Sequence, residues 1–494
     1  MNSPLRNFFA PVALFGAMSV GVSAFAAVEA TPESQGVSSE AILRWVNNLE
    51  KNFVGIHGFV IRRHGKVIAE GSWKPFDTLN EPHMLYSHSK VFTSTAIGFL
   101  VDDEKLDLDD RVAEILADKL PDNPSPELKS LRVRDLLSMT MGTPGHRLKG
   151  DCDWVKMALA KKFNSAPGTN FHYDSDATFL LAAIVERKVG RSMMDYLKDR
   201  LFTPLGFGRV STSTSPCGIP CGGWGMYMTT RDISKLGQLF LDEGMWGDKR
   251  IISAEWVRLA SAKQTKTTWD EADWKLGYGF QFWRCRHNAY RADGAYGQLT
   301  IVMPDQDAVV SMNAGLSNLG DQLSTVWNYL LKAMKDAPLK ENPVALDKLR
   351  KRCDELRYSP IAGKRDGDSI VMGKTFKFNK NKRGFETISF EKTVDGWECS
   401  FKTRCGVQKF PIGFCEWKKS AIKVDPENFE GLGYCIGKQQ VAASGAMTAD
   451  GKFSVMVFFS NTPFRLTLNF AEKDGKVTAE GEFYGMNGCK LTAK

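Results

Sequence analysis

The sequence predicts an α/β or α+β domain followed by a β-rich barrel or sandwich domain, and two patterns support this fold class. Strand patterns occur near both ends of the first 340 or so residues, with helical patterns between them. That order indicates one sheet assembled from distant segments and covered by helices. Further along, short alternating strands separated by Gly, Asn and Asp replace the helices, as in a sandwich or barrel.

The first 26 residues have the pattern of a cleaved export signal. Arg6 precedes an apolar run over residues 8–22, and Ala24-Phe25-Ala26 supplies an A-x-A cleavage site. A membrane anchor is the alternative, but the run is short and no later run could span a bilayer. We therefore expect a periplasmic or secreted protein with a first domain over residues 27–338 and a second over residues 339–494.

Apolar spacing sets the elements expected in the first domain. They are helices at about 38–51, 86–101, 131–138, 178–189, 230–243 and 320–335, and strands at 58–62, 67–70, 278–284, 298–303 and 308–312. The second domain should open with a short helix at 346–356. Its clearest strands are expected at 375–378, 387–390, 454–458 and 465–470.

The most informative stretch is Tyr86-Ser87-His88-Ser89-Lys90, which opens a buried helix. Residues three apart share a helix face, so the Ser87 hydroxyl and the Lys90 amine should lie side by side. The unsatisfied N–H groups at a helix start favour an oxyanion, and a buried lysine loses its proton more easily. This pattern predicts an activated serine nucleophile. A second S-x-x-K match, at 420–423, lies in a polar Lys-rich stretch and is expected at the surface.

Two further segments could complete such a site. In Tyr173-Asp174-Ser175, the phenol could relay a proton, or Tyr173 could be an ordinary packing residue. The glycine-rich segment 291–298 precedes an apolar strand. There a backbone N–H could complete an oxyanion hole with that of Ser87, or the segment could be only a tight turn. No G-x-S-x-G elbow occurs, which excludes the usual α/β-hydrolase arrangement.

In this order, S-x-x-K, Y-x-S and a glycine-rich strand entry resemble the serine β-lactamase and penicillin-binding protein superfamily. The chain is most similar to its class C-related hydrolases, namely D-aminopeptidases, carboxylesterases and 6-aminohexanoate-dimer hydrolases. The likeness covers about residues 31–335 and includes the stretches 136–140, 167–169, 223–225 and 293–298. It implies a β-lactamase/DD-peptidase-like antiparallel sheet flanked by helices, with a helical subdomain.

The resemblance also implies roles for individual residues. Ser87 would be the acylated nucleophile, Lys90 its general base, and Tyr173 a proton shuttle that also activates the deacylating water. The N–H groups of Ser87 and of a residue near Ala295 would hold the oxyanion. The residues expected to bind substrate or oxyanion are Ser87, Ser175, Asp293, Gly294 and Ala295.

The sequence departs from the superfamily pattern at two positions. Ser175 stands where class C β-lactamases usually have asparagine. The third motif, K-T-G or H-x-G in those enzymes, reads Ala292-Asp293-Gly294 here, so the cation that would bind a substrate carboxylate is missing. Arg291 and His287 are nearby cations, but neither is in register. This argues against β-lactamase activity and leaves ester or amide hydrolysis open.

Charge and cysteine content limit the partners. The net charge of +8 falls to +7 without the signal, which suits either a solvated surface or contact with anionic cell-envelope polymers. No basic run interleaved with aromatics indicates nucleic acid. The ten cysteines could pair, for example Cys217 with Cys221, or remain free and buried. Neither C-x-x-C nor H-E-x-x-H spacing occurs, so we expect no metal and no cofactor.

Two functions follow from these patterns. The first is an exported serine hydrolase that acts through a Ser87 acyl-enzyme on a small-molecule or peptide substrate with an ester or amide bond. The second is a catalytically impaired binding or sensor protein that uses the same cleft, with the β-rich domain recognising the cell surface. The missing third-motif cation and the extra domain motivate the second function.

Overall fold

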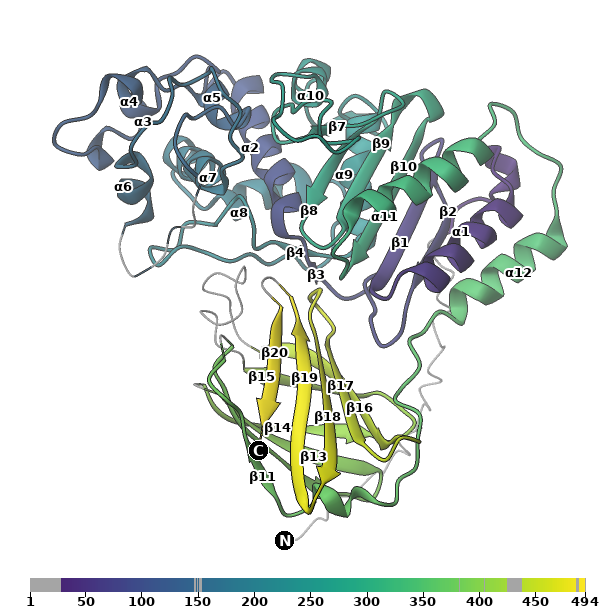
Figure 1. Ribbon diagram of the computed structural model, residues 1–494. Coiled ribbons are helices and arrows are strands. Elements are labelled where there is room, and N and C mark those ends of the chain that lie inside the picture. Colours follow the sequence, from purple (N-terminus) through teal and green to yellow (C-terminus); the bar gives the residue numbers. More distant parts are fainter. Residues whose placement is uncertain are drawn as a thin grey trace, which may run out of the picture.

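A six-stranded antiparallel sheet, in the order β2-β1-β10-β9-β8-β7, forms the centre of the first domain (Figure 1). Strands from the two ends of the domain lie next to each other in it, which confirms the predicted fold class. The strands are β1 (Ile56–Arg63), β2 (Lys66–Ser72), β7 (Trp283–Arg284), β8 (Tyr290–Gly294), β9 (Gln298–Met303) and β10 (Ala308–Ala314). The computed structural model describes residues 28–145, 148, 150, 153–381, 383–403, 405–423, 438–485 and 488–493, so the predicted signal segment lies outside the described residues.

Helices cover both faces of this sheet (Figure 1). On one face, α1 (Ser39–Asn52) packs beside α11 (Leu319–Thr325) and the π-helical turn that continues it, and their apolar side chains share one core with the sheet. On the other face, α9 (Thr230–Leu241) packs against β1, β9 and β10. The predicted boundary at residue 338 stays a prediction, and the helix that follows it, α12 (Pro343–Asp354), packs on α1 and β2.

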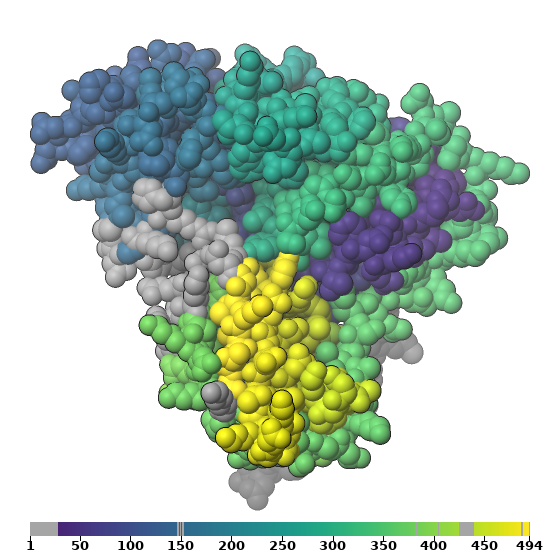
Figure 2. All heavy atoms as spheres, viewed as in Figure 1, coloured from purple at the N-terminus to yellow at the C-terminus, as the bar shows by residue number. Residues whose placement is uncertain are grey.

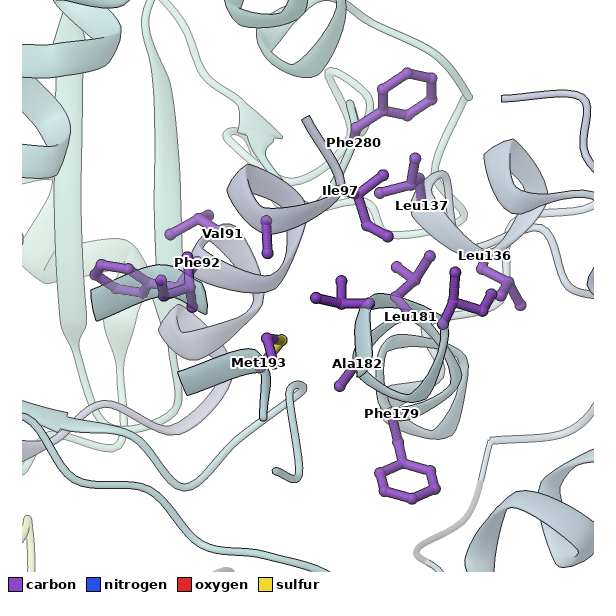
Figure 3. Close-up of a cluster of buried hydrophobic side chains, with 14 of the residues drawn as sticks. Val91, Phe92, Ile97, Leu136, Leu137, Phe179, Leu181, Ala182, Met193 and Phe280 are labelled. Atoms are coloured by element: carbon purple, nitrogen blue, oxygen red, sulfur yellow. The ribbon is translucent and has the colours of Figure 1, made fainter. Parts of the chain in front are cut away.

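A helical subdomain is built around α2 (Lys90–Asp102), whose residues 90–100 are all buried. A helix that is apolar on all sides must be enclosed by others, and Figure 3 shows α2 packed beside α5 and α7 (Ser175–Val189). Ile97, Leu137 and Leu181 are among the side chains that lie there (Figure 3). The remaining helices of the domain are α3 (Val112–Ile115), α4 (Pro126–Ser130), α5 (Val133–Leu137), α6 (Trp154–Leu159), α8 (Met193–Leu197) and α10 (Ala254–Ser261).

The second domain is a near-barrel of ten strands, which fulfils the prediction of a β-rich domain. Its two ends meet where Phe378 bridges Ala493 and the Asn379 N–H donates to the Thr492 carbonyl at 2.9 Å. Buried aromatic side chains fill its interior. The strands are β11 (Thr375–Lys377), β12 (Phe385–Lys392), β13 (Gly396–Thr403), β14 (Gly406–Gly413), β15 (Lys418–Lys423), β16 (Lys438–Met447), β17 (Phe453–Phe459), β18 (Arg465–Lys473), β19 (Lys476–Tyr484) and β20 (Cys489–Ala493).

One of the local predictions needs correction. The strand expected over 278–284 is reduced to β7, because Gln281 adopts a left-handed backbone with φ +72°. The glycine-rich segment 291–298, for which a strand edge and a tight turn were both open, contains each of them: β8 extends through Gly294, and residues 295–297 form the turn that leads into β9. The second S-x-x-K match, in contrast, lies at the surface as predicted, in β15, with Ser420 half-buried and Lys423 exposed, and residues three apart on a strand point to opposite faces.

Two further observations concern the whole described chain. None of its helices is both long and apolar enough to cross a bilayer. No disulfide joins two of the described cysteines, so the suggested pair Cys217 and Cys221 is not bonded to each other.

A buried ion triad fixes the start of α7. Lys161 Nζ lies 2.8 Å from Asp174 Oδ2 and 3.0 Å from Asp176 Oδ2, and the three side chains are at most 4% exposed. Asp174 also caps α7 by accepting the Asp176 N–H at 2.8 Å. Carboxylates at a helix N-terminus interact favourably with its dipole. The triad therefore holds the backbone on both sides of Ser175 and directly after Tyr173.

We predict that Lys161→Met lowers the free energy of unfolding of the first domain by about 3–5 kcal/mol, because two buried carboxylates lose their cation. Urea denaturation followed by circular dichroism measures this change. The matched control is Arg44→Met, which breaks the exposed pair Arg44–Glu40 on α1 and should cost less than about 1 kcal/mol. Equal stability of the two variants would contradict the role of the triad.

Candidate active site

Ser87 lies in a one-turn 3-10 helix, η2 (Tyr86–Ser89), that runs directly into α2. The predicted helix from residue 86 is therefore present, although its first turn is 3-10 rather than α. Tyr86, just before the serine, has φ +50°, a left-handed conformation that is costly for a bulky residue. Ser87 itself is partly exposed, whereas Lys90 is 1% exposed.

Lys90 joins three segments of the chain through its ammonium nitrogen. Lys90 Nζ donates to Ser87 Oγ at 3.1 Å, to Ser175 Oγ at 2.9 Å and to the Gly223 carbonyl at 2.7 Å. All three acceptors are neutral oxygen atoms. Gly223 must be a glycine here, because a Cβ on it would lie 2.8 Å from the Ser175 carbonyl oxygen. The sequence identified Ser87, Lys90 and Ser175, but nothing in it indicated the role of the Gly223 carbonyl.

Tyr173 completes the polar cluster around Ser87. Burial raises the pKa of the Tyr173 phenol above its usual range, while its hydrogen bond with Ser87 acts in the opposite direction. The Lys90 Nζ atom lies 4.8 Å from the centre of the Tyr173 ring. The ring also stacks on Trp283 at 5.7 Å and lies 6.0 Å from that of Trp269. Tyr173 thus packs against aromatic residues and contacts the serine at the same time.

The third predicted segment, β8, ends beside η2. A Cβ on Gly294 would lie 2.1 Å from the Leu85 carbonyl oxygen and 3.1 Å from the His88 nitrogen, so only glycine allows the two backbones to approach this closely. Ala295 follows directly. The N–H groups of Ser87 and Ala295 donate to no carbonyl of the described backbone. They are therefore available as a pair of donors at the site.

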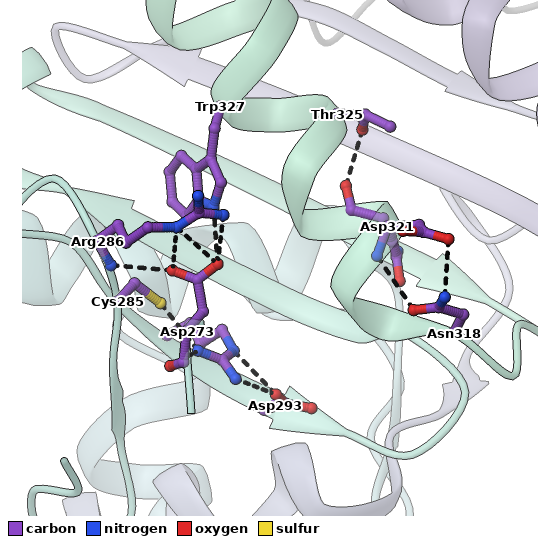
Figure 4. A network of polar contacts seen from close by, with 10 residues as sticks. Asp273, Cys285, Arg286, Asp293, Asn318, Asp321, Thr325 and Trp327 are labelled. Atoms are coloured by element: carbon purple, nitrogen blue, oxygen red, sulfur yellow. Dashed lines mark hydrogen bonds and ion pairs between the residues drawn. The ribbon is translucent and has the colours of Figure 1, made fainter. Parts of the chain in front are cut away.

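Asp293 is held by Arg291 within β8 (Figure 4). Arg291 Nε and Nη2 each lie 2.8 Å from Asp293 Oδ2, and the Arg291 side chain is 0% exposed. The same guanidinium donates to the Asp273 carbonyl and to Cys285 Sγ, and it lies over the Trp274 ring at 4.3 Å. Burial raises the pKa of the Asp293 carboxyl, and the charge of Arg291 opposes this.

The third motif thus lacks an accessible cation at the site. Ala292, in register with the cation of the superfamily, points into the apolar core of the helical subdomain. Arg291 is buried and engaged by Asp293. His287 lies in the exposed turn at the opposite end of β8 from Gly294, beside Trp327. Neither of the two substitutes considered from the sequence therefore reaches Ser87.

The cluster has the parts that acyl transfer needs, namely a hydroxyl, an amine and a phenol in contact with it, and two N–H donors. Sequence patterns did not indicate Lys161, because its partners lie 13 and 15 residues away. They did not indicate the Arg291–Asp293 pair, because it requires residues 291 and 293 to share one face of a strand. Among the described residues, no three His, Cys, Asp or Glu side chains are grouped as metal ligands would be.

Comparison with known proteins identifies the family. The family model described as Beta-lactamase matches residues 46–322, more than half of the chain. The 6-aminohexanoate-dimer hydrolase of Paenarthrobacter ureafaciens is 26% identical over 330 residues, which cover 61% of this chain and 83% of that protein. Penicillin-binding protein 4 of Amycolatopsis lactamdurans is 28% identical over 250 residues, covering 43% of this chain and 65% of that protein.

A solved structure from Bacillus anthracis, assigned as a 6-aminohexanoate-dimer hydrolase, shares the fold with a TM-score of 0.50 at 18% identity. The match covers 62% of this chain and 87% of that one. The first domain, with its antiparallel sheet and its flanking helices, therefore shares the fold of that structure. The chain belongs to the beta-lactamase family of serine hydrolases.

Proposed function

We propose that this serine hydrolase acts through an acyl-enzyme on Ser87, with an ester, amide or peptide as substrate. The observation that carries the proposal is the set of three hydrogen bonds made by Lys90 Nζ. When Lys90 Nζ, the donor to all three oxygens, loses one proton, its two remaining N–H groups suit Ser175 Oγ and the Gly223 carbonyl, and its lone pair can then accept from the Ser87 hydroxyl. That arrangement lets Lys90 take the hydroxyl proton as Ser87 attacks a carbonyl carbon.

Tyr173 is proposed to pass the proton onward. Its phenol contacts Ser87, and its raised pKa keeps it protonated at neutral pH, so it can donate to the leaving group. Water that later attacks the acyl-enzyme would lose a proton to the same pair, Tyr173 and Lys90. The N–H groups of Ser87 and Ala295 would hold the oxyanion in both steps.

The third motif supports a substrate without a carboxylate at this position. Asp293 and Arg291 are the two charged residues of β8 that act on Tyr173, and their charges neutralise each other. A substrate carboxylate at this position would lose its hydration and meet no accessible cation, because the buried Arg291 is already paired with Asp293. We therefore favour esters and amides with neutral acyl groups over β-lactams, whose carboxylate the superfamily binds through the missing cation.

Export is part of the proposal. The pattern of Arg6, the apolar run at 8–22 and Ala24-Phe25-Ala26 supports cleavage of a signal and activity in the periplasm or outside the cell. A mildly basic net charge is compatible with substrates held in an anionic envelope.

We predict that Ser87→Ala and Lys90→Met each reduce the hydrolysis of p-nitrophenyl butyrate by at least about a thousandfold, since each removes a member of one catalytic unit. Intact-mass spectrometry should show one fluorophosphonate adduct on the wild type and none on Ser87→Ala. The matched control is Ser420→Ala, in the second S-x-x-K match. An adduct without turnover would instead favour the binding or sensor function, and full activity of Ser87→Ala would refute the proposal.

We predict a second, independent property, namely discrimination against acyl groups that carry a carboxylate. The kcat/KM for p-nitrophenyl butyrate should exceed that for p-nitrophenyl hemisuccinate by about tenfold or more, because the hemisuccinate carboxylate would be desolvated beside β8 without an accessible cation. Asp293→Asn should reduce this ratio, whereas Asp305→Asn, in the exposed turn after β9, should not change it. Equal kcat/KM for the two esters in the wild type would contradict the assignment.

A further inference from the structure

One end of the near-barrel contacts the first domain (Figure 2). We call this end the tip and define it as residues 460–464 between β17 and β18 together with Tyr484 at the end of β19. Phe464 packs into the same apolar cluster as Tyr86 and Tyr296, and Tyr484 contacts Tyr296. The Met84 N–H donates to the Asn461 carbonyl at 2.9 Å, two residues before Tyr86. The second domain is thus bonded to the segment that carries Ser87.

Tyr86 and Tyr296 flank the two candidate oxyanion donors. Tyr86 precedes Ser87, and Tyr296 follows Ala295. Both adopt left-handed backbone conformations, with φ +50° and +68°. Such conformations are costly for aromatic residues and persist only where the surroundings hold them. Something other than the local backbone must therefore stabilise the two turns that present these N–H groups.

The tip supplies that support through ring contacts. The Tyr86 and Tyr296 rings lie 5.5 Å apart, and Phe464 packs edge-on against them at 6.4 Å and 6.1 Å. Tyr484 adds a contact with Tyr296 at 6.1 Å. Phe464 is only 2% exposed. One aromatic side chain of the second domain thus touches both strained residues of the first.

The tip is itself rigid. The Phe464 N–H donates to Thr462 Oγ1 at 3.1 Å, and the Phe459 N–H donates to the Phe464 carbonyl at 3.0 Å. Behind Phe464, the Phe483 ring lies 5.5 Å away within the near-barrel core. A side chain fixed on both sides can hold its neighbours in one geometry.

We propose that the near-barrel is a structural part of the active site, in which Phe464 and Tyr484 are positioning residues for the oxyanion hole. By holding Tyr86 and Tyr296, they fix the N–H groups of Ser87 and Ala295 in relation to each other. This inference rests on the proposed function, because it assigns those two N–H groups to the oxyanion. It gives the second domain a role in catalysis that needs no ligand of its own.

The test compares Phe464→Leu with Phe470→Leu. Phe470 lies on β18 and contacts Phe376, Phe390 and Phe453, all within the near-barrel, so this control perturbs the second domain away from the site. With p-nitrophenyl butyrate, Phe464→Leu should lower kcat by about tenfold or more and change KM by less than about threefold, since loss of one oxyanion donor costs roughly 10²–10³ in kcat. Phe470→Leu should leave both constants within about twofold.

A second readout distinguishes positioning from general stability. Phenylboronic acid forms a tetrahedral adduct with an activated serine and so reports on the oxyanion hole. Its inhibition constant should rise with Phe464→Leu by about the same factor as kcat falls. Circular dichroism verifies that the variants are folded, and Tyr484→Leu, at a half-buried position, serves if Phe464→Leu does not fold.

The outcomes separate the two proposals. If Ser87→Ala abolishes activity but folded Phe464→Leu and Tyr484→Leu retain wild-type kcat and boronate affinity, the positioning role is wrong and the hydrolase function stands. If Phe470→Leu lowers kcat as much as Phe464→Leu, the effect belongs to the whole near-barrel and the specific role of the tip is refuted. If Ser87→Ala is fully active, both proposals fail.

Discussion

The structure of the site depends on the buried amine of Lys90. Its three hydrogen bonds connect α2, the start of α7 and the glycine-rich segment at 222–225, which are far apart in the sequence. A buried amine without these oxygen partners would be strongly destabilising. The hydrogen bonds that stabilise the buried Lys90 amine also direct it toward Ser87. Folding and acyl transfer therefore need the same position of one nitrogen atom. The need to shield the Lys90 amine from water accounts for the burial of α2 by the surrounding helices. The close approach of Gly223 to Ser175 leaves no room for a side chain on Gly223.

A second constraint operates at β8, where Arg291 and Asp293 are buried and paired, so that neither charge is available to a substrate. Arg291 and Asp293 lie on the same face of the strand, two residues apart, and satisfy each other. Replacing an accessible cation by a self-contained pair keeps the strand in register beside η2 but changes what the site can bind. The family fold is thus retained, and in our proposal the change at β8 alters substrate specificity rather than mechanism.

Local sequence patterns predicted a large part of this protein because the relevant signals are local. The three-residue spacing of Ser87 and Lys90 is sufficient to predict that their side chains share a helix face. The apolar run at 298–303 is sufficient to predict the strand β9. The strand β8 was missed because charged residues and glycines are typical of turns, and only the pairing of Arg291 with Asp293 makes them acceptable in a buried strand. Lys161 lies more than ten residues before its partners, so no spacing rule could reveal the triad. The near-barrel was predicted as β-rich, but its closure depends on contacts between its first and last strands.

The relation between the two domains could not be predicted at all, since it depends on surfaces rather than patterns. Tyr86 gives no sign in the sequence that its backbone is left-handed, and Phe464 resembles any core phenylalanine of a β domain. The contact between the two rings accounts for the left-handed backbone of Tyr86 and for the burial of Phe464 at the tip. A strained residue next to a nucleophile needs a rigid neighbour, and in this chain that neighbour comes from the second domain. In our proposal, a domain that packs against the nucleophile segment restricts the catalytic geometry through that contact, even though side chains fill its own interior.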